Sequence, residues 1–264
     1  MSKIIMLGMG HATVTQCYNT CFLLQSGHSQ LLVDAGGGNG ILRQLKAVGC
    51  PITNLHHLFV THAHTDHILG TIWLIRMVAQ SKDYEGTFHI YSHDKGILVM
   101  RTICQMTLSK KHLAKMEERI VFHELEDGDQ WLVNDMRLQC FDIHSSKEKQ
   151  FGFRAQLADG KCVVCLGDEP FNEANRQMAS SADWLLSEAF CLYADRDIYK
   201  PYEKCHSTAR DAGELAESLG CRNLLLYHSE EDTLASHRMA YAEEAAEMFS
   251  GHVVAPLELE TVEL

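Results

Sequence analysis

The chain has 264 residues, of which 46% are hydrophobic, and it carries a formal net charge of −12. This length and apolar content allow a sizeable core, and we expect a single domain over residues 1–264. The negative charge disfavours binding to polyanions, and the absence of any run of about 20 apolar residues predicts a cytoplasmic protein without a membrane span.

The first quarter of the chain alternates strand and turn patterns. Apolar runs at 4–7, 21–25 and 30–33 predict strands, and Gly27-His28-Ser29 predicts a hairpin turn between the last two. Apolar residues then recur at helical spacing over 41–48. The glycine-rich stretch 34–40 between them lacks the Lys-Ser/Thr pair of a phosphate-binding loop, so we interpret it as a turn that lines the pocket of the metal site predicted below.

Four residues able to bind a metal follow the apolar run Leu58-Phe59-Val60. His62 and His64 are two positions apart in an extended segment, so their imidazoles point to one side and can share one cation. Asp66 and His67 lie in the following turn, where the side-chain direction changes and a second cation is within reach. This density of ligands at the end of a buried strand predicts a metal site, and two metals bridged by one water form a hydrolytic centre.

The middle of the chain continues with a predicted helix at 68–80, a strand at 88–91 and a mostly helical stretch at 92–118. Strand patterns follow at 120–125, 131–133 and 136–143. The last of these breaks into His144-Ser145-Ser146. From the residues alone His144 is either a loop residue or a ligand.

Two further strands are predicted at 151–157 and 162–166, joined by a turn at 158–161. The second strand ends in Gly167-Asp168. A carboxylate at the tip of a buried strand can bridge two cations, and it can equally serve as the N-cap of a helix at 171–178. Both interpretations of Asp168 stay open at this point.

The last part of the chain carries two more histidines at element boundaries. After a strand at 184–188 comes a charged loop at 194–204 that contains Tyr199 and Tyr202. Ser207 is a capable N-cap for a helix reaching 219, which places His206 just outside the helix N-terminus. A strand at 223–227 ends at His228, and a helix at 235–248 and a terminal strand at 253–262 complete the chain.

The motif His62-Ala63-His64-Thr65-Asp66-His67 resembles the HxHxDH signature of the metallo-β-lactamase superfamily. Together with Gly167-Asp168, His206-Ser207-Thr208-Ala209 and Tyr227-His228-Ser229, it is similar to the ribonuclease Z branch, which processes tRNA 3′ ends. The resemblance runs over nearly the whole chain. It implies a four-layer αββα sandwich of the α+β class, with two mixed β-sheets flanked by helices.

The resemblance also implies roles for individual residues. One metal ion would be held by His62, His64 and His144, a second by Asp66, His67 and His228, and Asp168 would bridge the two. Zn²⁺ suits these ligands best, and Mn²⁺ or Fe²⁺ would also fit. The implied reaction is phosphodiester hydrolysis by a metal-bridging hydroxide, with Asp66 orienting or deprotonating the water and His206 assisting the leaving oxygen.

The chain departs from ribonuclease Z in ways that concern the substrate. The interval between His144 and Asp168 is a bare hairpin without the family's tRNA-gripping arm, so tRNA is disfavoured and a small phosphodiester is expected. Ser207, Tyr199 and Tyr202 are the predicted substrate contacts. A homodimer is compatible with the sequence.

Two other functions stay open at this stage. Hydrolysis of a lactone, thioester or sulfate ester is the alternative on the same metal core, because the core alone does not choose the electrophile. A metal-binding regulator without turnover is the third hypothesis.

Overall fold

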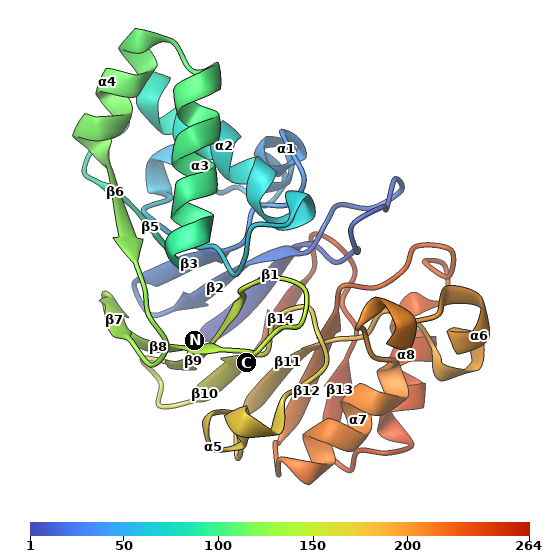
Figure 1. The fold of residues 1–264 in the computed structure, drawn as a ribbon. Coiled ribbons are helices and arrows are strands. Elements are labelled where there is room, and N and C mark those ends of the chain that lie inside the picture. Colours follow the sequence, from blue (N-terminus) through green and yellow to red (C-terminus); the bar gives the residue numbers. More distant parts are fainter.

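The computed structural model describes residues 1–264, and its strands form two sheets of seven. The first, here called the N-terminal sheet, contains six strands from the first half of the chain and one from its end (Figure 1). In spatial order they are β14 (Thr261–Glu263), β1 (Ser2–Gly8), β2 (Cys21–Ser26), β3 (Ser29–Val33), β4 (His57–Phe59), β5 (Phe88–Ser92) and β6 (Ile120–Glu124).

The second sheet, here called the C-terminal sheet, takes all of its strands from the second half of the chain. Its spatial order is β13 (His252–Val254), β12 (Asn223–Tyr227), β11 (Trp184–Glu188), β10 (Cys162–Cys165), β9 (Phe151–Gln156), β8 (Met136–Asp142) and β7 (Gln130–Val133). Both sheets are mixed, because antiparallel hairpins at one side continue into parallel strands at the other.

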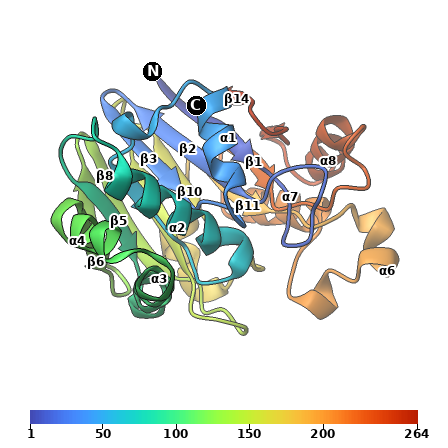
Figure 2. The same cartoon turned by 90° about the horizontal axis from the view of Figure 1, so that it is seen from above.

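Helices cover the outer face of each sheet (Figures 1 and 2). On the N-terminal sheet these are α1 (Gly40–Ala47), α2 (Thr65–Gln80), α3 (Asp94–Thr107) and α4 (Lys110–Arg119). The C-terminal half adds α5 (Arg176–Ala179), α6 (Arg196–Tyr199), α7 (Ala209–Ser218) and α8 (His237–Ala246). The predicted αββα sandwich is therefore confirmed.

Three apolar clusters hold the layers together. One cluster lies between the two sheets, with Phe22, Phe59 and Phe153 almost fully buried, and the other two lie between each sheet and its helices. Strands buried on both faces explain why runs such as Leu224-Leu225-Leu226 are continuously apolar, since successive side chains enter different clusters. None of the helices is both long and apolar enough to span a bilayer.

The parallel strands place the ends of the apolar runs at one edge of the sandwich. β3 and β4 run parallel to each other, as do β10, β11 and β12. The segments that follow the carboxyl ends of these strands therefore converge, and they contain Asp34, the motif from His62 to His67, Asp168 and His228.

Two local predictions were wrong. The N-cap of α7 is Thr208, not Ser207: its hydroxyl accepts from the amide of Asp211, and the Asp211 carboxylate accepts from the Thr208 amide, which forms a capping box. The predicted single strand at 253–262 is two short strands in different sheets, because Pro256 interrupts strand pairing between β13 and β14.

Candidate metal centre

The central motif connects β4 to α2. The chain stays extended through His64, which is the N-cap of α2, and Asp66 lies in the first helical turn. A carboxylate there is favoured by the partial positive charge of the helix N-terminus. His62 and His67 are almost completely buried, and Asp66 is 5% exposed. The local sequence thus holds three polar side chains inside the protein and a fourth, His64, partly exposed at its surface, all at the end of a strand.

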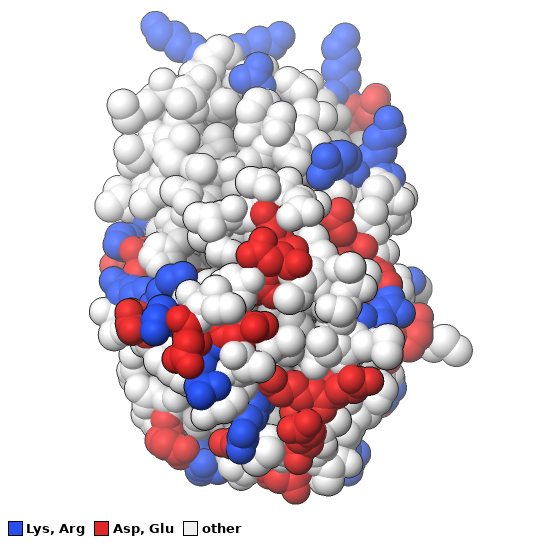
Figure 3. Space-filling view, turned by 90° about the vertical axis from the view of Figure 1, so that its right-hand side faces the viewer, with Lys and Arg blue, Asp and Glu red and all other residues white.

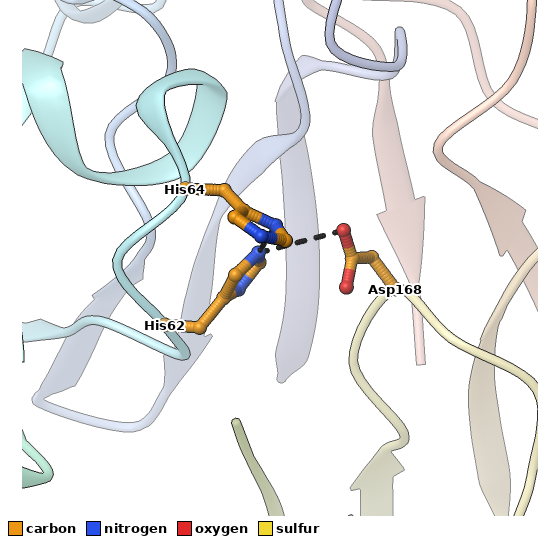
Figure 4. Close-up of side chains that lie close together, drawn as sticks. All are labelled: His62, His64 and Asp168. Carbon is orange, nitrogen blue, oxygen red and sulfur yellow. Dashed lines mark hydrogen bonds and ion pairs between the residues drawn. The ribbon is translucent and has the colours of Figure 1, made fainter. Parts of the chain in front are cut away.

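The structure brings six of the seven predicted ligands together in two groups. One contains His62, His64 and Asp168, which face one another in Figure 4, and the other contains Asp66, His67 and His228. Within each group the ligand atoms all lie within 4.8 Å of one another. Residues more than 160 positions apart in the chain therefore meet at one edge of the sandwich.

Asp168 lies between the two groups. Its Oδ2 is 3.5 Å from His62 Nε2, 3.4 Å from His67 Nε2 and 3.5 Å from His228 Nε2. Its Oδ1 accepts a hydrogen bond from the buried Gln150 amide at 2.5 Å. Burial alone raises the pKa of Asp168, but His62, His67 and His228 outweigh burial and hold that pKa well below its ordinary value. Asp168 is an anion placed to contact both groups.

Asp34, which follows β3, orients the imidazoles of His67 and His62 through their Nδ1 atoms, on the side of each ring away from the centre. Its Oδ2 lies 2.7 Å from His67 Nδ1 and accepts at 2.8 Å from the Thr61 hydroxyl, which in turn contacts His62 Nδ1 at 2.8 Å. With each Nδ1 engaged, the Nε2 atoms of both rings point into the centre. A carboxylate behind a histidine is the usual support of a metal-binding imidazole.

The donor set fits divalent metal ions. His67 Nε2 and both ring nitrogens of His228 are buried without a hydrogen-bond partner, and an unsatisfied buried polar group costs about 1–3 kcal/mol. Burial alone lowers the pKa of His67, but the Asp66 and Asp34 carboxylates outweigh burial and raise that pKa well above its usual range. The centre therefore attracts positive charge and has free lone pairs to bind it.

His144 is the one predicted ligand that the structure does not bring into either group. Its side chain is 47% exposed, and the nearest acid is Asp142, whose Oδ1 lies 4.0 Å from His144 Nδ1. The backbone at His144 is left-handed, with φ at 58°, and its amide donates to Asp142 Oδ1 at 2.7 Å. In this conformation His144 belongs to neither ligand group, so its role as a ligand remains a prediction.

Two other residues of the site share this backbone conformation. Asp34 has φ at 55° and His228 has φ at 61°. The left-handed region costs a residue with a Cβ roughly 1–2 kcal/mol, and such strain is typical of functional sites. In both residues it aims a polar side chain inward at the point where a strand ends.

His206 lies beside the two groups and is paired with an acid that the sequence analysis missed. The ring stacks on Phe190 with centroids 4.8 Å apart and lies 5.2 Å from the His228 ring. His206 Nδ1 is 3.6 Å from Oε2 of Glu188, which is 1% exposed. Glu188 ends a buried strand just as Asp168 follows one, and this shared pattern is the signal that could have identified it.

The three predicted substrate contacts are engaged elsewhere in the protein. Ser207 donates to Glu188 Oε1 from both its amide, at 2.5 Å, and its hydroxyl, at 2.6 Å. The Tyr199 hydroxyl donates to Asp232 at 2.9 Å and the Tyr202 hydroxyl to Asp211 at 2.8 Å. Ser207 therefore holds Glu188 in position, and none of the three lines the cleft described next.

A cleft of about 400 Å³ opens over the two groups. Besides predicted ligands and His206, its lining includes His11 and Lys147, which the sequence analysis did not single out. The His11 ring packs edge-on against Phe190, and burial followed by the neighbouring His228 and His206 lowers its pKa to about 4. His11 is therefore neutral at pH 7, and Lys147 is the one lysine or arginine in the cleft lining.

Charge is distributed unevenly over the molecule. Residues 1–119 contain 11 Lys and Arg against 7 Asp and Glu, whereas residues 120–264 contain 12 against 28. On the face shown in Figure 3, the upper end carries mainly Lys and Arg, and acidic side chains with further Lys and Arg among them spread over the middle and lower parts. A long polyanion would meet repulsion over much of this face.

Comparisons with known proteins agree with this architecture. A family model described as anti-Pycsar protein Apyc1 matches residues 2–248. Ribonuclease Z of Bacillus cereus is 31% identical over 250 residues, covering 76% of this chain and 79% of that protein. Ribonuclease Z of Myxococcus xanthus is 26% identical over 313 residues, covering 99% and 97%.

A solved structure shows the same fold. The metallo-β-lactamase fold protein YhfI from Bacillus subtilis superposes with a TM-score of 0.78 at 23% identity, and the match covers 100% of both chains.

Proposed function

Because the chain belongs to the family described as anti-Pycsar protein Apyc1, a ribonuclease Z-like part of the metallo-β-lactamase superfamily, we propose that it is a phosphodiesterase with two divalent metal ions. Membership makes the chain a metal-dependent hydrolase. The number of ions and the small size of the substrate belong to the proposal. The observation that carries it is Asp168 Oδ2, which lies 3.4–3.5 Å from Nε2 of three imidazoles in two ligand groups.

The ligands divide between the two ions as the two groups suggest. His62 and His64 would hold one ion, with His144 joining them after its side chain turns inward. Asp66, His67 and His228 would hold the other, and Asp168 would contact both. Neutral imidazoles and carboxylates without thiolates suit Zn²⁺ first and Mn²⁺ or Fe²⁺ next.

When bound, the two ions would supply an activated water near neutral pH and a clamp for phosphoryl oxygens. Burial alone raises the pKa of Asp66, but His67 and His228 outweigh it and keep Asp66 ionised well below neutral pH. A carboxylate of such low basicity is better suited to orienting water than to storing its proton. His206, backed by Glu188, lies beside the metal ligands and can hold a proton for the leaving oxygen.

The cleft favours a compact substrate. One lysine, Lys147, lines it, which suits a single phosphodiester, whereas a folded tRNA requires several phosphate contacts from Lys and Arg. The interval between His144 and Asp168 contains a short loop at 145–150, then β9, β10 and the turn between them, without a gripping arm. The acidic face in Figure 3 adds to the argument against tRNA.

Hydrolysis of another ester class is the second candidate. The two ligand groups would serve a lactone, thioester or sulfate ester equally well. The Glu188–His206 pair favours the phosphodiester over a thioester, because an alkoxide leaving group benefits from a positioned acid and a thiolate does not need one. Opening a lactone also expels an alkoxide, so direct comparison of substrates is required.

The test is a panel assay. Purified protein loaded with Zn²⁺ or Mn²⁺ is given bis-p-nitrophenyl phosphate, a cyclic phosphodiester, a lactone and a tRNA precursor at matched concentrations. We expect the highest kcat/KM on one of the two small diesters. A higher value on the lactone would replace the proposed reaction class, and a higher value on the tRNA precursor would refute the proposed substrate size.

A further inference from the structure

A second group of histidines lies far from the metal centre, on three neighbouring strands of the N-terminal sheet. His57 begins β4, His89 lies in β5 and His123 lies in β6, the edge strand. His57 is opposite His89 in the register, and His123 is opposite Tyr91, two residues further along β5. Alternation along a strand therefore places all three imidazoles on the same face of the sheet.

The three rings contact one another in a row. The His57 and His89 rings stack with centroids 5.2 Å apart and planes 13° apart. His89 Nδ1 and His123 Nε2 lie 2.9 Å apart, and the Tyr91 hydroxyl is 3.3 Å from His57 Nδ1. These two nitrogens share a hydrogen bond whose proton a metal ion between them would replace, and each of the three rings is partly exposed.

This face of the sheet is the inner one, but the other sheet does not cover the histidines. Trp131 of β7 stacks on Phe59 and Tyr91, which follow His57 and His89 on the same face. β7 is the edge of the C-terminal sheet, as β6 is the edge of the N-terminal sheet. The row of histidines therefore lies at the open margin of the sandwich, where an ion from solvent can reach it.

We propose that His57, His89 and His123 form a separate mononuclear site for a divalent transition-metal ion of the class of Cu²⁺, Ni²⁺ or Zn²⁺. His89 and His123 would supply the two nitrogens that now share a hydrogen bond, and rotation of the His57 side chain would bring the third. Three imidazoles without a carboxylate suit this class of ion, whereas Mg²⁺ and Ca²⁺ require oxygen ligands.

The surroundings keep the ligands available at neutral pH. Burial, followed by the charges of His89, His56 and His123, lowers the pKa of His57 to about 4. Burial lowers the pKa of His89 and His123 as well, with His56 and His89 respectively adding to the effect. No carboxylate is among the groups that shift these pKa values, so the imidazoles are neutral at pH 7 and a metal ion competes with few protons. A bound ion would also link the edge strand β6 to β5 and β4.

The test uses protein whose catalytic centre is already filled with Zn²⁺. Cu²⁺ is added below one equivalent per chain, and the electron paramagnetic resonance spectrum reports how many imidazole nitrogens bind it. We expect one Cu²⁺ per chain with three nitrogens, and with two nitrogens in His57→Ala. The double variant His89→Ala/His123→Ala should lose the spectrum of imidazole-bound Cu²⁺ while keeping its Zn²⁺ content and its turnover.

The matched control is His28→Ala/His252→Ala, which removes two exposed histidines elsewhere and should bind Cu²⁺ as the wild type does. A wild-type spectrum with one nitrogen or none, or an unchanged spectrum in the double variant, would overturn the site. If the double variant does not fold, histidine side-chain resonances of the wild type decide, because bound Cu²⁺ must broaden those of His89 and His123 first. If the added Cu²⁺ instead displaces Zn²⁺ from the catalytic centre, that result would also count against the proposal.

Discussion

The two ends of strand β4 carry imidazoles in opposite electrostatic settings. Beyond its carboxyl end, His67 lies between Asp34 and Asp66, whose charges outweigh burial and raise the pKa of the imidazole. At its amino end, His57 has only other histidines as charged neighbours, and its pKa falls to about 4. The comparison teaches that the neighbouring acids, more than the histidines themselves, determine whether a cluster becomes a centre for two hydrolytic cations or a neutral imidazole site.

Among the substitutions considered, replacing Asp168, which lies between the two ligand groups, should damage the metal centre most. Asp168→Ala should remove at least one metal ion per chain and lower turnover on the order of 10³-fold, because several kcal/mol of transition-state stabilisation are lost. Elemental analysis and steady-state kinetics measure the two effects. Asp159→Ala, in the turn between β9 and β10, is the matched control and should behave as wild type; full metal occupancy in Asp168→Ala would falsify the shared role.

His206→Ala should separate chemistry from metal binding. We expect a loss of about 10²- to 10⁴-fold in kcat with unchanged metal content, as is typical when a positioned acid is removed. Glu188→Gln should lower kcat in the same direction by less, since it leaves the imidazole in place. If His206→Ala loses a metal ion, His206 belongs to the ligand group that it forms with Glu188 and His228 instead.

Asp34→Asn tests the support behind the imidazoles. The amide keeps the shape of the carboxylate but removes the charge next to His67, and changes of this kind typically reduce metal affinity or activity about 10- to 100-fold. Competition with a chelator measures the affinity. Thr61→Val, which removes only the link to His62, should have a smaller effect; equal losses would place Asp34 in a purely structural role.

The lowered pKa of His57, at the amino end of β4, should make the stability of the protein depend on pH. The folded protein keeps His57 neutral down to about pH 4, while the unfolded chain binds this proton near pH 6.5, so stability falls as the pH is lowered through that window. A cost of about 1 kcal/mol corresponds to roughly 2–4 °C in a chain of this size.

Melting curves of wild type and His57→Gln in metal-free buffer isolate this contribution, because both proteins share every other titrating group. The groups that face His57 are His56, His89, His123 and Tyr91. The wild type should lose more stability than the variant between pH 6.5 and pH 4. Parallel curves would mean that His57 titrates normally in the folded state.

The sequence predicted the site unevenly, for physical reasons. His62 to His67 lie within six residues, so strand and helix geometry alone indicated that they share a centre. Asp168 and His228 required the family resemblance, since nothing local relates them to that motif. Asp34 was predicted only as the start of a turn lining the metal pocket, and Glu188 went unrecognised, although both stand at the end of an apolar strand. The row from His57 to His123 depends on strand register, which spacing along the chain does not reveal.

The left-handed backbone at His144 has a consequence for anyone who engineers this protein. The exposed imidazole makes no close contact that rewards its conformation, and glycine would adopt the same φ of 58° without the clash of a Cβ. After subtraction of the larger conformational entropy that glycine loses on folding, His144→Gly should stabilise the fold by at most about 1 kcal/mol. Selection for heat resistance alone would therefore replace His144 early. If the selected variants are expressed as well as the wild type but turn over substrate more slowly, stability and catalysis make opposite demands on this position.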